Sequence, residues 1–451
     1  MADESKLQIA IIGAGIAGLG AAIALKHHPA IDVQIYEKAP ELREIGASIA
    51  LGPNGMRTLE RLGVNNALDD EIAFRNKSRY PMIYRHWKTN EIISTDSHVG
   101  NVEYRHLTAR FYRAHLQEAL AKHVDPSRIH FFKAFESVVF DSAIRKLWIT
   151  FTDKTTTTAD IILGADGIHS AVRTFFVPTS STAWTGWVAF RSVFPFSHVA
   201  HIKDLPDEAS HFWGPDRTFF ISKLGRDLFT VVGSYQADPD APDAPYKDST
   251  WNSGGDVNVL RELYRDWSPL VRQIVDAVPS TRVYPNAAAR TLDTWVLGDG
   301  RVTLAGDAAH AHGGAFAAGG SLALDDAWAF ASAILHVFPA NAAAAGARKK
   351  PSDVEIHRAL RIYERTRKPH TDRVMSVVHQ SNKSKVARYS RAREPETDEQ
   401  LRARIKSRVD PSWIHEHDAQ AAFAQAVADE AEAESGAGTT DRVSVGEQAR
   451  L

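Results

Sequence analysis

Short apolar runs alternate with helical stretches at the start of the chain. Residues 9–12 (I-A-I-I) form an uninterrupted apolar run, which is typical of a parallel strand buried on both faces. A glycine-rich turn follows, then residues 17–26 with helical composition, and then a second apolar segment over 33–36. This order predicts a β-α-β unit and a doubly wound α/β domain.

The middle of the chain has a different pattern. From Thr182 to Gln236, segments such as 187–191 and 228–232 are rich in β-branched and aromatic residues. They predict a mainly antiparallel sheet. Residues 301–305 return to the parallel-strand pattern, and 322–338 and 354–380 predict helices. The fold class is therefore mixed α/β, with a sheet domain inserted into the doubly wound domain.

Composition excludes several classes of protein. Lys and Arg number 53 against 55 Asp and Glu, a net charge of −2, so we expect no nucleic-acid partner. The chain has no cysteine, which rules out disulfides, thiolate nucleophiles, iron–sulfur clusters and cysteine-based zinc sites. No apolar run reaches the roughly 18 residues of a membrane span, so we expect no integral membrane segment.

The two termini bear on location. The acidic start, with Asp3 and Glu4, lacks the basic region of a secretory signal, so we expect a cytoplasmic protein. The last three residues, Ala449-Arg450-Leu451, resemble a relaxed form of the C-terminal peroxisomal address. Peroxisomal import is therefore the alternative. The sequence leaves monomer and homodimer open.

Residues 13–18 read G-x-G-x-x-G between the first strand and the first helix. Gly13 permits the tight turn, Gly15 lets the backbone approach a pyrophosphate, and Gly18 lets the helix pack on the sheet. Glu37 ends the second strand, at the distance where a carboxylate binds an adenosine ribose. This fingerprint predicts dinucleotide binding and does not distinguish NAD from FAD.

Two later motifs narrow the choice. Residues 164–173 read G-A-D-G-I-H-S-A-V-R, and residues 306–310 read G-D-A-A-H. With the first turn, their order and spacing resemble the single-component flavin-dependent aromatic hydroxylases, over residues 7 to 380. The resemblance implies a Rossmann-like FAD-binding domain, an inserted antiparallel substrate domain and C-terminal helices, with NADPH or NADH as co-substrate. In this family the nicotinamide cofactor binds without a second dinucleotide fold.

The resemblance divides the chain into segments. Residues 1–180 would form the first part of the FAD-binding domain, 181–290 the substrate-binding sheet, and 291–380 the return segment with its helix. Residues 381–434 would form a C-terminal helical segment. Residues 435–451 are rich in Gly, Ser, Thr and charge, which predicts a disordered tail.

The resemblance also implies which residues bind FAD. Asp307, before a helix N-terminus, can accept a hydrogen bond from a ribityl hydroxyl, and Asp166 would lie near the pyrophosphate. Ala47 belongs to a segment, 44–49, that resembles the loop passing the flavin. Arg113 maps to an arginine that reaches FAD, with a solvated helix arginine as the alternative. Gly319 and Gly320 complete the predicted cofactor set, at the start of the next helix.

The sequence departs from the family after residue 310. Family members commonly continue with P-x-x-P-x-x-G-x-G, whereas residues 311–319 read A-H-G-G-A-F-A-A-G. Both prolines are absent, and Ala317 replaces the first of the later glycines. Because the second proline shapes the wall between flavin and substrate, Gly314 in its place puts the inherited substrate geometry in doubt. This form, with W-I-H-E-H-D-A over 413–419, resembles a fungal branch called salicylate hydroxylases.

Candidate substrate residues lie mostly on predicted strands. Arg191 and His211 could pair with a substrate carboxylate or phenolate, the alternative for Arg191 being a surface arginine. His312 or His211 could act as the base that stabilises a phenolate, and Gly314 would adjoin them. The His310/His312 and His415/His417 pairs lack a third ligand, so we expect no metal site.

The leading hypothesis is an FAD-dependent monooxygenase that uses NAD(P)H and O2. A flavin C4a-hydroperoxide would transfer one oxygen to a small phenolic aromatic acid, most simply salicylate, which would lose its carboxyl group and become a catechol. The alternatives are a monooxygenase that hydroxylates or epoxidises a larger polyketide or indole, a flavin oxidase or reductase, and a non-catalytic FAD-binding scaffold.

Overall fold

The structure is a computed structural model that describes residues 5–42, 47–238, 253–340, 350–389 and 396–447. Its first layer is a parallel sheet with the strand order β19-β12-β1-β2-β8. Strand β1 pairs with β2 on one side and β12 on the other, both in parallel. The predicted β-α-β unit is confirmed. The bounds are β1 (Leu7–Ile12), α1 (Ile16–Leu25), β2 (Ile31–Tyr36), β8 (Ile129–His130), β12 (Ile161–Gly164) and β19 (Val302–Leu304).

The second layer is an eight-stranded sheet with the order β17-β18-β13-β16-β15-β14-β5-β6. Its pairings are antiparallel except that between β14 and β5. The predicted antiparallel character is therefore confirmed. The bounds are β5 (Ile83–His86), β6 (Ile92–Thr95), β13 (Thr182–Pro195), β14 (Ser210–Trp213), β15 (Arg217–Leu224), β16 (Leu228–Gln236), β17 (Ser253–Gly255) and β18 (Thr281–Ala289).

Two strands of this sheet come from an unexpected part of the chain. We expected residues 1–180 to belong wholly to the first domain, but β5 and β6 extend the large sheet at the β14 edge. The parallel pairing of Ser210 with Ile83 makes this join. The sequences of these two short strands do not indicate which sheet they join, because strand pairing depends on residues far away in the chain.

A third, three-stranded sheet lies against the large one. Its order is β3-β7-β4, and Ser48 Oγ of β3 accepts a hydrogen bond of 2.9 Å from Thr230 Oγ1 of β16. Strand β7 ends at Tyr112 and the following helix α3 begins at Arg113. The bounds are β3 (Ser48–Leu51), β4 (Phe74–Arg75), β7 (Ala109–Tyr112) and α3 (Arg113–Ala121).

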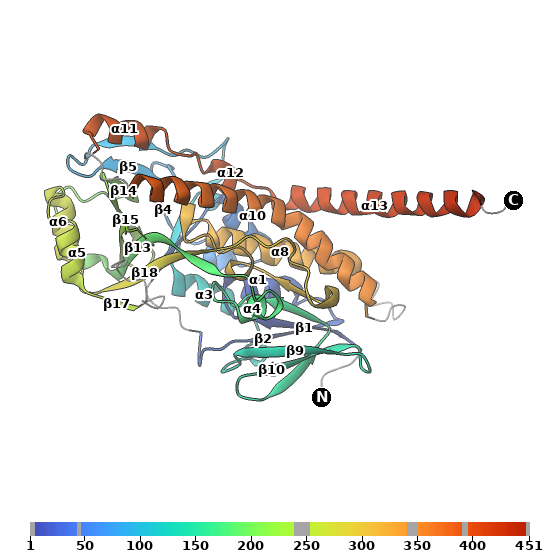
Figure 1. Cartoon of the computed structure of the whole chain (residues 1–451). Helices are drawn as coiled ribbons and strands as arrows, with labels where there is room; N and C mark the ends of the chain where they lie inside the picture. Colours follow the sequence, from blue (N-terminus) through green and yellow to red (C-terminus); the bar gives the residue numbers. More distant parts are fainter. Residues whose placement is uncertain (1–4, 43–46, 239–252, 341–349, 390–395, 448–451) are drawn as a thin grey trace.

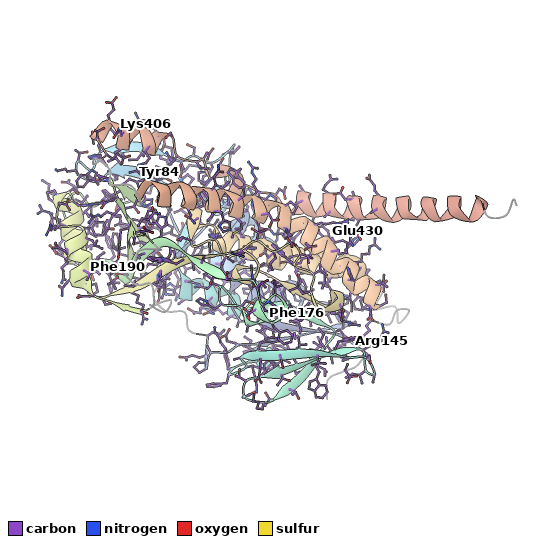
Figure 2. All side chains as sticks on the ribbon, viewed as in Figure 1. Tyr84, Arg145, Phe176, Phe190, Lys406 and Glu430 are labelled. Carbon is purple, nitrogen blue, oxygen red and sulfur yellow. The ribbon has the colours of Figure 1, made fainter. Side chains whose placement is uncertain are left out.

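The large sheet buries one face under two helices. Phe190, Phe212 and Phe219 are fully buried there, in a cluster with Tyr264 and Trp267. Aromatic side chains thus form much of the core on this face. Figure 1 shows the two helices, α5 (Val257–Leu263) and α6 (Pro269–Asp276), at the outer side of the sheet, and Figure 2 labels Phe190 beside them. The opposite face therefore turns towards the three-stranded sheet.

Helices cover the parallel sheet and continue to the C-terminus. In Figure 1 the long helix α13 projects away from the body of the molecule, and a separate hairpin sheet of β9 to β11 lies at the lower edge. None of the helices in the described part of the chain has the length and apolar character to cross a membrane. The remaining bounds are α2 (Pro53–Arg61), α4 (Ala171–Phe176), β9 (Phe135–Asp141), β10 (Lys146–Phe151), β11 (Thr156–Ala159), α7 (Asp307–His310), α8 (Gly319–Val337), α10 (Asp353–Tyr389), α11 (Asp398–Lys406), α12 (Ser412–His415) and α13 (Ala419–Glu447).

The last helix of the structure extends into the predicted C-terminal tail. Composition predicted disorder from residue 435, but α13 continues to Glu447. The alanine-rich stretch from Ala419 provides strong helix formers, and a helix that has nucleated extends at little cost. Residues 448–451, which include the tripeptide compared with a peroxisomal address, lie outside the described residues.

Candidate active site

The glycine-rich turn joins β1 to α1. Gly13 has φ +106° and lies so close to β12 that a Cβ atom there would be 2.4 Å from the carbonyl oxygen of Ala165. A Cβ on Gly18 would be 2.0 Å from the carbonyl oxygen of Gly13, whereas a Cβ on Gly15 would face open space. Gly13 and Gly18 therefore allow close packing, and Gly15 leaves room at the N-terminus of α1, which has no side-chain cap. This is the arrangement that binds a pyrophosphate.

Glu37 contacts the same turn. Its Oε2 accepts a hydrogen bond of 2.8 Å from the Ala14 amide, and its Oε1 accepts one of 2.9 Å from Ala39. Gln117, which the sequence analysis missed, donates from Nε2 to the Ala14 carbonyl at 3.2 Å. Since Gln117 lies four residues after Arg113 on α3, both can share one face of that helix. That spacing is the signal that could have indicated Gln117.

Asp166 has a structural task in the protein itself. Its Oδ1 accepts a hydrogen bond of 2.5 Å from Ser170 Oγ, and its Oδ2 accepts bonds from the amides of Ala171 at 2.7 Å and Val172 at 3.1 Å. Burial raises the pKa of Asp166, although these hydrogen bonds oppose the shift. Asp166 thus orders the start of α4 next to Gly13, and any contact with a pyrophosphate would come in addition.

Asp307 and Gly319 belong to two neighbouring helix starts. Asp307 is exposed at the first residue of α7, after Gly306 with φ +61°. A Cβ on Gly319 would lie 4.0 Å from Asp307 Oδ1 and 3.3 Å from His312 Nε2. Gly320 plays a different part, because a Cβ there would be 2.7 Å from the side chains of Ile49 and Leu51. Gly320 therefore lets α8 pack against β3.

A buried network of charged side chains holds the turn before Asp307 through the Gly306 amide. Asp326 Oδ2 accepts hydrogen bonds from the Gly306 amide at 2.8 Å and from His310 Nε2 at 2.6 Å, while its Oδ1 accepts from Arg367 Nε at 2.8 Å. All three side chains are at least 97% buried. The positive charges of His310 and Arg367 outweigh the effect of burial and lower the pKa of Asp326 to about 2.

Ala47 and Arg113 lie side by side. The Arg113 amide donates to the Ala47 carbonyl at 3.0 Å, which ties the start of α3 to the segment before β3. Ala47 is buried, and the rest of the compared segment, 44–46, lies outside the described residues. The charge of Arg113 contributes to lowering the pKa of Arg191, after the larger effect of burial. Arg113 therefore lies at the junction of the cofactor and sheet residues.

Strand register places two predicted substrate residues in one row. In the large sheet, Arg191 of β13 is opposite Val232, Val232 is opposite Phe220, and Phe220 is opposite His211. Residues directly opposite one another share a face of a sheet. Arg191 and His211 therefore face the same side, the one turned towards β3 and β7. They are three strands apart, about 14 Å, so they do not touch.

Arg191 is largely buried, not a surface arginine. Its guanidinium carbon lies 5.0 Å from the centre of the Tyr284 ring, and its Nη2 would be 3.3 Å from a Cβ on Gly314. No carboxylate pairs with the Arg191 guanidinium within the described part of the chain, and its Nε is buried without a hydrogen-bond partner there. A buried cation without a carboxylate partner is energetically unfavourable, so this position favours the binding of an anion.

His211 and His312 are both held neutral. His211 lies among the rings of Trp213, Phe220 and Tyr84, and burial lowers its pKa to about 3. His312 is 4% exposed, and burial also lowers its pKa. Neither ring nitrogen of His312 has a hydrogen-bond partner among the described residues. His312, with Gly314 two residues later, is the predicted base nearest to Asp307 and Gly319.

Three further polar residues near this face escaped the sequence analysis. Arg110 of β7 is 3% exposed, and its guanidinium carbon lies 5.8 Å from the ring centre of Phe220. Buried atoms of Arg110, Asn286 and Gln236 have no partner within the described ranges. Such orphan groups are rare in folded proteins. Only contacts across the three-dimensional structure reveal them, so no local sequence signal could have found them.

The predicted residues thus form two groups that meet near Gly314. Cofactor candidates surround the starts of α1, α7 and α8, and substrate candidates lie on the large sheet and in the 311–318 loop. Nothing in the described ranges gathers three or more His, Asp or Glu side chains as a metal site would. The open N-terminus of α1, the space at Gly15 and the exposed Asp307 suit a group that carries a pyrophosphate and hydroxyls.

Comparison with known proteins identifies this group. Residues 6–193 match the model of an FAD binding domain. The chain is 30% identical to a 3-amino-4-hydroxybenzoate 2-monooxygenase of Streptomyces cremeus over 332 residues, which cover 72% of this chain and 77% of that protein. The chain belongs to the FAD-dependent aromatic hydroxylases.

Other comparisons agree with this family. The chain is 26% identical to a salicylate hydroxylase of Pseudomonas putida, over 94% of this chain and 95% of that protein. The fold also matches a solved salicylate hydroxylase substrate complex, with a TM-score of 0.73, 21% identity, and coverage of 94% and 98%. The enzyme is thus an FAD-dependent monooxygenase in class, and its fold is that of these hydroxylases.

Proposed function

We propose that the enzyme uses NAD(P)H and O2 to hydroxylate a small phenolic aromatic acid, most simply salicylate, with loss of the carboxyl group. Bound FAD supplies the oxygen-transfer chemistry. The residues around Gly15, Glu37, Asp307 and Gly319 would hold it. Relatives named salicylate hydroxylase and 6-methylsalicylate 1-monooxygenase, at 26% and 27% identity, support this substrate class.

The observation that carries the proposal is the state of Arg191. Its guanidinium is largely buried beside Tyr284 and has no anionic partner in the described part of the chain. A substrate carboxylate would supply the missing negative charge through charge-assisted hydrogen bonds. Gly314 keeps this position open, because a side chain there would meet Nη2 of Arg191.

The two histidines would act on the phenol. Burial favours the neutral form of His312, and neither of its ring nitrogens has a hydrogen-bond partner among the described residues. His312 could therefore accept the phenolic proton and raise the electron density of the ring. His211, neutral within its aromatic surroundings, lies farther along the same face. We assign the base role to His312 and a substrate-orienting role to His211.

The length of the sheet face that carries Arg191 and His211 favours a second candidate substrate class. Between Arg191 and Tyr84 the row crosses β16, β15 and β14, about 19 Å of sheet, and it includes Phe220 and His211. This extent suits a larger aromatic secondary metabolite, such as a polyketide or indole, better than a single ring. Such a substrate would use the same cofactor residues.

The test is NAD(P)H oxidation by the purified yellow enzyme with and without salicylate, with product masses measured. We expect stimulation and catechol. The Arg191→Met variant should keep FAD and lose most of the stimulation, while Arg217→Met should behave as wild type. Arg217 lies on the same sheet but is paired with Asp216 at 2.6 Å. Equal behaviour of the two variants would exclude the carboxylate role of Arg191.

The same assay decides between the two substrate classes. Absent stimulation by any small aromatic acid, with an intact flavin spectrum, would exclude the salicylate proposal and favour the larger metabolite. Release of hydrogen peroxide as the only product, with every substrate tried, would instead indicate an oxidase.

A further inference from the structure

The 311–318 loop carries Gly314 and connects His312 to the start of α8, so its shape defines the junction of the cofactor and substrate residues. Its own sequence does little to rigidify it. It contains no proline, and Gly313 and Gly314 have φ of +68° and +74°. Phe316 and Ala317 also adopt positive φ, +56° and +53°, although both carry a Cβ. Such residues keep this conformation only when their surroundings enforce it.

On one side the large sheet supports the loop. A Cβ on Gly313 would lie 3.2 Å from Thr185 Cγ2, and one on Gly314 would lie 3.3 Å from Arg191 Nη2. Both glycines belong to the first half of the loop. The strained residues Phe316 and Ala317 need a support of their own.

A distant segment supplies that support. Residues 396–418, which we call the C-terminal strap, include α11 and α12 and the W-I-H-E-H-D motif. Ile414 is fully buried in one cluster with Ala318 and Leu322, and Phe316 packs against this cluster. The ring of His415 lies next to the backbone of Phe316, which raises the pKa of His415 against the larger lowering effect of burial. The same ring lies against Gly52, where a Cβ would be 2.6 Å from His415 Nδ1.

The strap is itself fixed at both ends. At the loop end, Glu416 accepts a 2.7 Å hydrogen bond from the Val99 amide. At the other end Ile405 of α11 is fully buried against Tyr84 of β5, and Arg408 lies 3.8 Å from the Tyr84 ring centre. Figure 1 shows α11 lying beside β5, and Figure 2 labels Lys406 and Tyr84 at this same end of the molecule. The strap therefore joins the substrate sheet to the loop.

We infer that Ile414 and His415 are positioning residues, which hold the 311–318 loop in its strained shape and so place His312 and Gly314 beside the flavin. The loop is held by residues more than 90 positions away in sequence (414 − 318 = 96), and not by rigid residues of its own. The inference rests on the family membership and the loop geometry, and it is independent of which aromatic compound is the substrate.

The test is hydrogen–deuterium exchange of the 311–320 amides in the FAD-loaded enzyme, which reports local opening directly. In Ile414→Ala these amides should exchange at least tenfold faster. The matched control is Ile405→Ala, which makes the same deletion at an equally buried strap position that contacts Tyr84 and not the loop. It should leave exchange of the loop within twofold of wild type.

A second pair of variants keeps the inference testable if Ile414→Ala does not fold. His415→Ala should also accelerate exchange of the loop and release FAD at lower temperature. His415→Gln, which keeps a polar side chain of similar length between Gly52 and the Phe316 backbone, should restore most of the protection. With any accepted substrate, Ile414→Ala and His415→Ala should divert NAD(P)H oxidation towards hydrogen peroxide.

Two outcomes would overturn the inference. One is unchanged exchange over 311–320 in both Ile414→Ala and His415→Ala. The other is equal acceleration in the Ile405→Ala control, which would indicate general destabilisation. Because exchange requires no substrate, neither outcome depends on the salicylate proposal, which fails only through absent stimulation in the assay above.

Discussion

Asp326 offers the sharpest test of the buried network behind the Asp307 turn. Its carboxylate accepts three hydrogen bonds, from the Gly306 amide, His310 and Arg367. The substitution Asp326→Asn keeps the shape but removes the charge. Because Arg367 is fully buried, its cation would then lose the only carboxylate in the described part of the chain to which it donates a hydrogen bond, and only the more weakly acting Asp325 would remain as a negative charge nearby.

The magnitude follows from that burial. Removing one partner of a buried ion pair costs about 3–5 kcal/mol. For a chain of 451 residues the entropy of unfolding is roughly 1 kcal/mol per kelvin, so Tm should fall by about 3–5 °C. Asparagine has one acceptor oxygen in place of two, so it cannot accept from both the Gly306 amide and Arg367. The turn before Asp307 should therefore be held less firmly, and FAD affinity should fall.

The matched control is Asp325→Asn, one residue earlier on the same helix. Asp325 is 1% exposed, and its oxygens accept hydrogen bonds from the neutral groups of Asn54 and Thr58 at 2.9 and 2.7 Å. Arg367 acts on Asp325 through its charge but makes no hydrogen bond to it among the described residues. Burial raises the pKa of Asp325, so loss of its charge should matter less, about 1 kcal/mol. Thermal melts of the FAD-loaded variants, with flavin fluorescence to report release, measure both effects.

The network also predicts a pH dependence. The folded pKa of Asp326, about 2, lies below that of an unfolded aspartate, about 3.9. Its contribution to stability is therefore complete above pH 4 and is lost as the pH falls through about 2. Asp326→Asn should lack this part of the acid dependence. Equal melting losses in the Asp326 and Asp325 variants would refute the reasoning.

Three further predictions concern point substitutions elsewhere in the chain. Gly15→Ala should abolish FAD binding with little change in apoprotein Tm, since its Cβ would fill open space, whereas Gly18→Ala should lower Tm because its Cβ would be 2.0 Å from a carbonyl oxygen. Differential scanning calorimetry and FAD titration separate the two. His211 has a pKa of about 3 in the folded protein and near 6.5 in the unfolded chain, so stability falls as the pH drops through this window. His211→Phe should therefore flatten the curve of Tm against pH. An unaltered slope would contradict the burial of His211 as a neutral group. Arg75→Met should lower Tm by about 3 °C because it removes hydrogen bonds to a carboxylate and three carbonyls. Arg110→Met should keep or raise Tm, since Nε and Nη1 of that buried guanidinium lack partners in the described part of the chain and only Nη2 donates, to the Pro81 carbonyl. A large loss of Tm in the Arg110 variant would count against that account.

Local sequence was sufficient for the cofactor turn. Gly13 and Gly18 lie close to backbone within a few residues or on the adjoining strand, Gly15 leaves open space, and Glu37 follows just after the next parallel strand. Hydrophobic periodicity likewise predicted the β-α-β unit and the antiparallel character of the middle of the chain, because side-chain alternation and apolar runs report burial directly.

Tertiary structure alone decided the arrangement on the substrate side. Register places Arg191 and His211 on one face, but the order of the strands, including the arrival of β5 from the first domain, determines how far apart they lie. The same holds for Asp326 with Arg367 and for Ile414 with the 311–318 loop, where residues tens of positions apart meet in one core. Local composition determines which segments become helices and strands, whereas the partner of a buried charge or a strained loop is set by packing between them, and no short stretch of sequence records it.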